Sequence, residues 1–308
     1  MSHAEPDLPT EVDNYLDWSD KGRAGIARYL VGLVLILVVF FLLGQVLSLP
    51  VAVAYPDHED SLIQSTVILL LSFVIPFFAI PALTHWVHQR PSWSVAMPRR
   101  ELRGWDFGVG FGVSAVVGLA TVAGAALVGA IDLEWGGMDW SRWLPLLAIG
   151  LVGLLIQTGA EEMLFRGYLT QLMRRLTSHP AVFLAVPALV FAAPHISNVK
   201  SLGGGPLVML PYFATGLLYG WAAYRSGSLY LSWGLHFNNN LFNLLVVGAS
   251  DDILKSVAPL QFPGPDLLVT TVIIVVQCAL TLAVLLPLIR RREAAGSLRV
   301  SEVAHGHA

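Results

Sequence analysis

The chain has 308 residues, of which 55% are hydrophobic and only 13% charged, and its mean hydropathy is +0.67. Soluble globular domains carry about 25% charged residues, so the composition argues against a soluble domain and predicts a membrane protein. The net charge of -3, without a basic patch, argues against nucleic-acid binding, and the single cysteine, Cys278, excludes an intrachain disulfide.

The N-terminal segment is polar and acidic, and it lacks the short apolar core of a signal peptide. We interpret residues 1–24 as a solvated cytoplasmic tail. Residues 293–308 have a similar character, and we interpret them as a second cytoplasmic tail.

Apolar segments of membrane-spanning length fill the rest of the chain, because a helix that crosses a bilayer needs about 20 mainly apolar residues. The sequence therefore predicts an all-α, polytopic membrane protein with about eight transmembrane helices. The predicted helices are 25–49, 62–87, 105–131, 144–172, 181–198, 206–224, 228–248 and 265–289.

The loops alternate in charge, and cytoplasmic loops carry an excess of Lys and Arg. Basic residues follow the second and last segments, whereas acidic residues follow the first. The basic loops include Arg99, Arg100, Arg103 and Arg290–Arg292, and the acidic loop holds Asp57, Glu59 and Asp60. This alternation supports eight spans with both termini in the cytoplasm.

Polar side chains are concentrated in three of the later segments. An ionisable group at the centre of a membrane helix costs about 2.5–3.5 kcal/mol on insertion scales, so it usually marks a function or an internal pair. The first three segments and the last have none near their centres. The polar residues of segments 144–172, 181–198 and 228–248 are Gln157, Glu161, Glu162, Arg166, His195, His236, Asn238, Asn239, Asn240 and Asn243.

The spacing of these residues separates two glutamates. Glu162 and Arg166 are four residues apart, so we expect an ion pair with a structural role. Glu161 points about 100° away around the helix and is left for chemistry. His236 and Asn240 are also four apart and share a face, and Pro194 predicts a broken helix before His195.

Depth in the membrane supports a shared site. At 1.5 Å per residue from the cytoplasmic ends, Glu161, His195, His236 and Asn240 lie at depths of about 12–21 Å. Each of them has an ordinary alternative as a hydrogen-bonding residue between helices, but their common depth predicts one water-filled pocket.

The motifs Glu161-Glu162-x-x-x-Arg166, Phe191-x-x-x-His195 and His236-x-x-x-Asn240 occur in this order on separate predicted helices. Together they resemble the CAAX-protease and bacteriocin-processing family of intramembrane proteases, also called the abortive-infection family, which includes type II CAAX prenyl endopeptidases. The resemblance covers about residues 145–245. It implies an eight-helix membrane endopeptidase.

The resemblance also implies residue roles. Glu161 and His195 would activate a water, His236 and Asn240 would hold the oxyanion, and Glu162 with Arg166 would support the site. We favour this chemistry without a cofactor. The alternative is zinc bound through Glu161, His195 and His236, with an open position for water.

The resulting domain plan places N-terminal transmembrane helices in 25–140, a catalytic transmembrane core in 141–250 and the last transmembrane helix in 251–292. The expected partners are the lipid bilayer and a peptide or membrane-protein substrate, with no nucleic acid, and a bacterial protein would lie in the plasma membrane. The alternative functions are a proton- or cation-coupled transporter using the paired glutamates, and a non-catalytic membrane scaffold or immunity protein. A transporter should show inverted repeats, which the sequence lacks.

Overall fold

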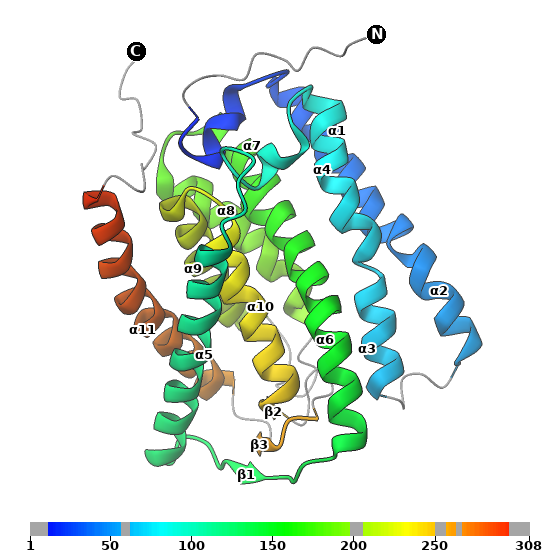
Figure 1. Cartoon of the computed structure of the whole chain (residues 1–308), viewed down its shortest axis with the longest axis vertical. Coiled ribbons are helices and arrows are strands. Elements are labelled where there is room, and N and C mark those ends of the chain that lie inside the picture. Colours follow the sequence, from blue (N-terminus) through cyan, green and yellow to red (C-terminus); the bar gives the residue numbers. More distant parts are fainter. Residues whose placement is uncertain (1–11, 57–61, 198–205, 250–256, 263–266, 296–308) are drawn as a thin grey trace.

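The structure is a computed structural model that describes residues 12–56, 62–197, 206–249, 257–262 and 267–295. It is a tall bundle of helices with a very small sheet at one end (Figure 1). The α-helices are α1 (Ile26–Val38), α2 (Gln45–Ala54), α3 (Leu62–Leu71), α4 (Val74–His88), α5 (Gly104–Leu127), α6 (Trp140–Glu161), α7 (Thr170–Leu176), α8 (Pro180–Ala192), α9 (Met209–Ser226), α10 (Tyr230–Leu245) and α11 (Leu267–Ala294). The shorter helical turns are η1 (Tyr15–Asp20), η2 (Val39–Leu43), η4 (Ser92–Val95), η5 (Glu162–Leu169), η6 (Ala193–Ser197) and η7 (Pro206–Val208).

The prediction of an all-α, polytopic membrane protein is confirmed. Within the described residues, five helical stretches are long and apolar enough to cross a membrane, namely Ile26–Ala54, Leu62–His88, Gly104–Leu127, Trp140–Leu176 and Leu267–Ala294. The other three predicted spans are also helical, but they are shorter or less apolar. The number eight therefore stays a prediction.

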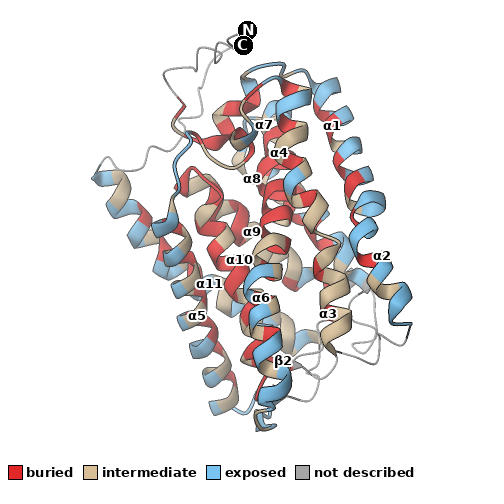
Figure 2. Cartoon of the chain, turned by 45° about the vertical axis from the view of Figure 1, so that its right-hand side comes forward, coloured by how far each residue is buried: buried red, intermediate tan, exposed pale blue. Residues whose placement is uncertain are grey.

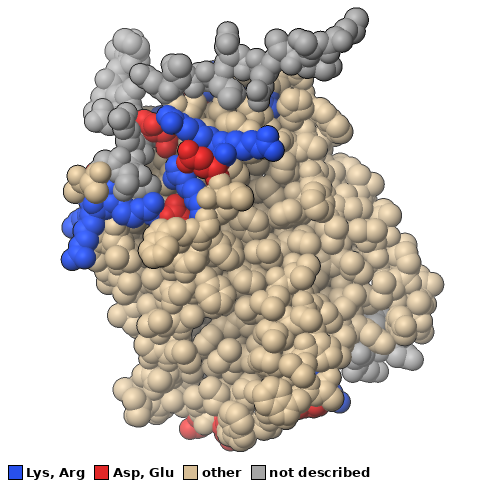
Figure 3. Space-filling model, viewed as in Figure 1, with Lys and Arg blue, Asp and Glu red and all other residues tan. Residues whose placement is uncertain are grey.

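Exposure and charge fit a lipid-facing belt. Exposed apolar side chains cover the outer faces of α1, α2, α5 and α11 (Figure 2). In Figure 3, Lys, Arg, Asp and Glu gather at the end of the molecule where α11 finishes, with a few charged groups, mainly acidic, at the opposite end and an uncharged band between them. Apolar surface on this scale is stable only in contact with lipid or a partner.

The interpretation of residues 1–24 as a solvated tail is wrong for residues 12–19, most of which are buried, whereas residues 20–24 are exposed or half-buried. The turn η1 packs against the bundle, and Tyr15, Leu16 and Trp18 are buried. The backbone oxygen of Trp18 accepts a hydrogen bond from the buried Arg90, and that of Tyr15 accepts one from Gln171, 2.9 Å away. The acidic composition predicted a solvated segment, although three of its large apolar side chains cover the end of the bundle.

The C-terminal boundary also differs from the prediction. The helix α11 continues through Glu293 to Ala294. The Glu293 carboxylate forms an ion pair with Arg225 of α9, whose Nη2 lies 2.6 and 2.9 Å from the two carboxylate oxygens. The neighbouring Arg292 pairs with the buried Asp106 of α5. These ion pairs hold the end of α11 against the bundle.

A small sheet, which the sequence did not predict, joins three loops at the end of the bundle opposite the C-terminal end of α11 (Figure 1). The strand β3 (Leu260–Phe262) lies between β1 (Glu134–Trp135), which is antiparallel, and β2 (Val247–Ala249), which is parallel. Since β2 follows α10 directly, the sheet fixes the end of the helix that carries His236 and Asn240.

The helices α5 and α10 approach closely through two glycines. A Cβ atom on Gly234 would lie 2.1 Å from the Phe107 oxygen, and one on Gly110 would lie 2.2 Å from the Leu231 oxygen. Two other glycines of α5 differ, because Gly108 and Gly112 have nothing within 4 Å of a Cβ.

We expect Gly234→Ala to force α5 and α10 apart and to destabilise the protein by about 1–3 kcal/mol, the usual cost of overpacking. Gly112→Ala is the matched control, and it should leave stability unchanged or raise it by up to about 1 kcal/mol, since alanine favours a helix. Thermal unfolding in detergent measures both. Equal unfolding temperatures for the two variants would contradict the close approach.

Candidate active site

The first motif lies where α6 changes into the wider turn η5, a π-helix that begins at Glu162. All eight residues of η5 are buried. The hydroxyl of Thr170 donates to the carbonyl oxygen of Phe165, five residues earlier, at 2.8 Å. Such turns inside helices occur frequently at functional sites, and the sequence spacing gave no sign of this one.

Glu162 and Arg166 form the expected ion pair, with 3.0 Å between Arg166 Nη1 and Glu162 Oε1. Their exposed fractions are 0% and 1%. The guanidinium lies over the rings of Phe191 and Tyr219, with Cζ 4.2 and 5.2 Å from the ring centres. A buried charge needs such partners because desolvation is costly.

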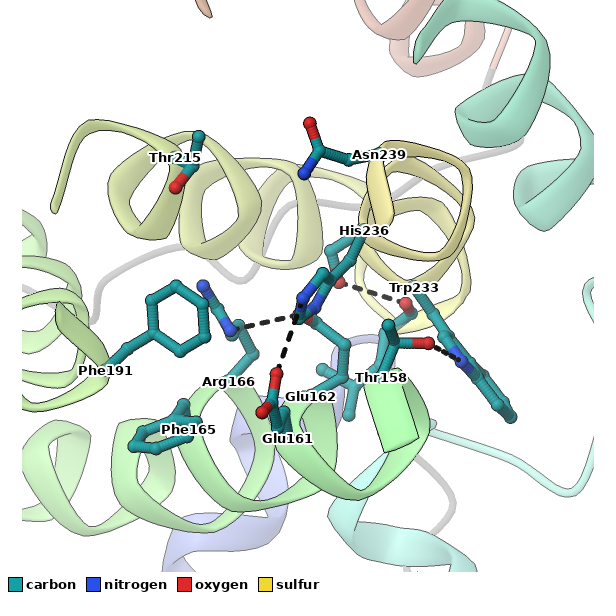
Figure 4. Close-up of polar contacts among 12 residues, drawn as sticks. Thr158, Glu161, Glu162, Phe165, Arg166, Phe191, Thr215, Trp233, His236 and Asn239 are labelled. Carbon is teal, nitrogen blue, oxygen red and sulfur yellow. Dashed lines mark hydrogen bonds and ion pairs between the residues drawn. The ribbon is translucent and has the colours of Figure 1, made fainter. Parts of the chain in front are cut away.

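His236 of α10 lies between the two glutamates (Figure 4). Its Nδ1 is 2.9 Å from Glu162 Oε1 and its Nε2 is 3.4 Å from Glu161 Oε2. An ionised carboxylate only accepts hydrogen bonds, so Nδ1 carries a proton and donates to Glu162. The ring also stacks on Tyr219 at 5.1 Å between centres. The direction of Nε2 toward Glu161 is thereby fixed.

Glu161 differs from its neighbour in exposure and in partners. Its side chain is 13% exposed, against 1% for Glu162. No ion pair within 4.0 Å joins it to Arg166 in the described part of the chain, where the arginine pairs with Glu162. This carboxylate therefore lies at the accessible side of the charge cluster.

His195 enters the site from η6, where the helix α8 has ended as Pro194 predicted. Its Nδ1 lies 2.9 Å from the Phe191 carbonyl oxygen, which can only accept. Nδ1 is therefore the donor, and in the neutral ring Nε2 is left with a free electron pair. The ring stacks on Tyr212 at 4.1 Å.

Phe191 joins the two histidines. Its ring centre lies 5.0 Å from that of His195 and 5.8 Å from that of His236. No ion pair connects His195 with Glu161 among the described residues, so the direct histidine partner of Glu161 in this conformation is His236. The second motif therefore contacts the charge cluster through the ring of Phe191.

Asn240 lies one turn beyond His236 on the same side of α10, which faces α6. Its Nδ2 donates to Gln157 Oε1 at 3.1 Å. The three motifs therefore meet, as their depths predicted. The other asparagines differ, since Asn238 donates to Ser114 at 3.0 Å on α5 and Asn243 is exposed.

Sequence reasoning assigned no role to several residues around the motifs. Tyr219, Tyr212 and Phe165 form aromatic walls, and no pattern separates them from other aromatic residues in apolar helices. Gln157 stands out in the sequence as a polar residue of an apolar segment, and its place four residues before Glu161 on one helix face could have suggested a role.

The described residues contain no group of three or more His, Cys, Asp or Glu side chains that could hold a metal ion. The choice between metal-free chemistry and zinc bound through Glu161, His195 and His236 therefore stays a prediction.

Comparisons with known proteins agree with the motifs. Residues 140–242 match the family described as type II CAAX prenyl endopeptidase Rce1-like. The match runs from the start of α6 into α10 and contains all three motifs, so the resemblance stated from the residues is confirmed.

A curated relative covers more of the chain. The uncharacterized protein YyaK of Bacillus subtilis (strain 168) is 26% identical over 208 residues, which cover 66% of this chain and 70% of the relative. No solved structure matches the chain. The family match supports a protease of the endopeptidase class and, with the apolar helices, an integral membrane protein.

Proposed function

We propose that this protein is an intramembrane endopeptidase that hydrolyses peptide bonds in CAAX-type prenylated or other membrane-associated peptides. The observation that carries the proposal is that two adjacent glutamates differ in exposure and in their ion-pair partners. Glu162 is fully buried against Arg166, whereas Glu161 stays partly exposed beside His236. One carboxylate is neutralised by the protein, and the other is available to a substrate and a water.

In the proposed reaction, Glu161 takes a proton from a water that the free Nε2 of His195 helps to hold. The water oxygen bonds to the carbonyl carbon of the scissile peptide, and the carbonyl oxygen becomes negative. The C–N bond then breaks, and the proton passes from Glu161 to the leaving nitrogen, so that a carboxylic acid and an amine are released. Such proton transfer typically contributes 10²–10⁴-fold to a rate.

His236 and Asn240 would bind the negative oxygen. Asn240 Nδ2 has two hydrogens, and only one is used by Gln157. For His236 Nε2 to donate while Nδ1 donates to Glu162, the ring must carry both protons, and Glu161 and Glu162 place a carboxylate beside each nitrogen. Donors fixed before the reaction stabilise an oxyanion at little reorganisation cost.

The test uses the full chain purified in detergent with a library of prenylated and unmodified peptides, read by mass spectrometry. We expect cleavage by the parent chain and none by Glu161→Ala or His195→Ala, and a zinc chelator should leave the parent rate unchanged. Equal cleavage by all three proteins would remove the assigned site. If no peptide is cut, ion uptake into vesicles would test the transporter alternative.

We also propose that both termini face the cytoplasm, as the basic loops indicate. In a chain carrying Cys278→Ala, a membrane-impermeant thiol reagent applied to intact cells should label Glu134→Cys in β1. It should not label Arg100→Cys at the opposite end until the membrane is opened. Both positions are exposed, so the reverse pattern would contradict this orientation.

A further inference from the structure

We propose that Gln157 is a positioning residue that fixes the Asn240 amide for the reaction, an inference that rests on the proposed function. Gln157 lies on α6, four residues before Glu161, and is 8% exposed. It is the shared neighbour of two residues from different motifs. Asn240 donates to its Oε1, and Glu161 follows it by one turn on the same face of α6.

The direction of these contacts follows from the chemistry of each group. The carboxamide of Gln157 has one accepting end, Oε1, and one donating end, Nε2. Its Oε1 is then the end that receives the 3.1 Å bond from Asn240 Nδ2. The glutamine therefore requires Asn240 to present its nitrogen, and not its oxygen, on the side of α6.

A third amide favours the same direction. Asn239 Nδ2 lies 3.4 Å from Asn240 Oδ1, at the long end of hydrogen-bond distances. The donors and acceptors thus run consistently from Asn239 through Asn240 to Gln157. Asn239 alone would hold the amide weakly, so most of the orientation comes from Gln157.

The orientation matters because an asparagine amide has two chemically opposite ends of nearly equal size. If the amide turned over, Asn240 would place a carbonyl oxygen beside the developing oxyanion and repel it. Gln157 prevents this reversal and leaves the second Nδ2 hydrogen free for substrate. Asn240 is the group that would touch the reacting atoms, and Gln157 acts through it.

The test is a double-mutant cycle of Gln157→Met and Asn240→Ala in the peptide assay. Methionine has nearly the length of glutamine but cannot replace its hydrogen bonds. We expect Gln157→Met to lower kcat by about 10-fold, less than the 10²–10³-fold typical for loss of an oxyanion donor, while KM changes less than twofold. In the Asn240→Ala background the same change should lower kcat less than twofold, since groups that act together are not additive.

Gln277→Met is the matched control, because Gln277 is a half-buried glutamine in the middle of α11. It should leave kcat within twofold of the parent. Full additivity of Gln157→Met and Asn240→Ala, or an equal loss in Gln277→Met, would overturn the positioning role.

A second measurement separates this inference from the proposed function. The side-chain amide signals of asparagine, labelled with ¹⁵N, identify Asn240 by the signal missing in Asn240→Ala. We expect that signal to move in Gln157→Met and to stay in place in Gln277→Met. An unmoved signal would overturn the inference even if the protein cuts peptides. A moved signal in a protein that cuts no peptide would support the contact and remove the function.

Discussion

Glu161→Gln is expected to lower kcat for peptide cleavage by about 10³–10⁴-fold, the upper part of the range for loss of a general base. The change keeps the shape of the side chain, so the contact with His236 Nε2 at 3.4 Å can persist as a hydrogen bond. What is lost is the ability to take a proton from water. KM should change little, because the substrate is bound by other groups.

The matched control is Glu134→Gln, which makes the same chemical change at an exposed position in β1. Its kcat should equal that of the parent. The two variants and the parent should unfold at similar temperatures, which separates lost chemistry from lost structure. A Glu161→Gln protein that keeps more than a tenth of the parent kcat would show that another group is the base.

The meeting of the three motifs could be predicted because each rests on a simple spacing. Residues four apart share a helix face, so the pairs Glu162–Arg166 and His236–Asn240 followed from the sequence. The cost of burying polar groups in a membrane then argued that they lie together. The break at Pro194 followed from the missing amide hydrogen of proline.

The pairing inside the cluster could not be predicted in the same way. The family resemblance implies that Glu161 and His195 act together on a water, and it gave no sign that His236 lies beside Glu161 as well. The π-helix that begins at Glu162 changes the direction of successive side chains, and no residue type marks its start. Small differences in direction decide which of two histidines a carboxylate meets.

The packing of the N-terminal turn η1 against the bundle was missed for a different reason. Its acidic composition is typical of a solvated tail, but Tyr15, Leu16 and Trp18 lie within four residues and become buried together. Their partners, which include Arg90 and Gln171, are far away in the sequence. Contacts of this kind depend on tertiary structure, which composition does not contain.

The second large effect concerns stability. Arg166→Met is expected to destabilise the protein by about 3–5 kcal/mol, because it leaves the Glu162 carboxylate buried without its cation. Glu162 is fully buried, so water cannot replace the guanidinium. The double variant Glu162→Leu/Arg166→Met should recover most of this loss, since replacing a buried ion pair by apolar groups is often neutral. It should remain inactive, because His236 Nδ1 has lost its acceptor.

Arg175→Met provides the comparison that makes the effect of Arg166→Met interpretable. Arg175 forms a 2.6 Å ion pair with Asp20, but its side chain is 42% exposed and that of Asp20 is 52% exposed. An exposed pair contributes about 0–1 kcal/mol because both charges stay hydrated. Thermal unfolding in detergent should therefore separate the two arginine variants clearly. If they unfold at the same temperature, burial does not set the energy of the Glu162–Arg166 pair, and the division of the two glutamates into a neutralised and an available carboxylate loses its basis.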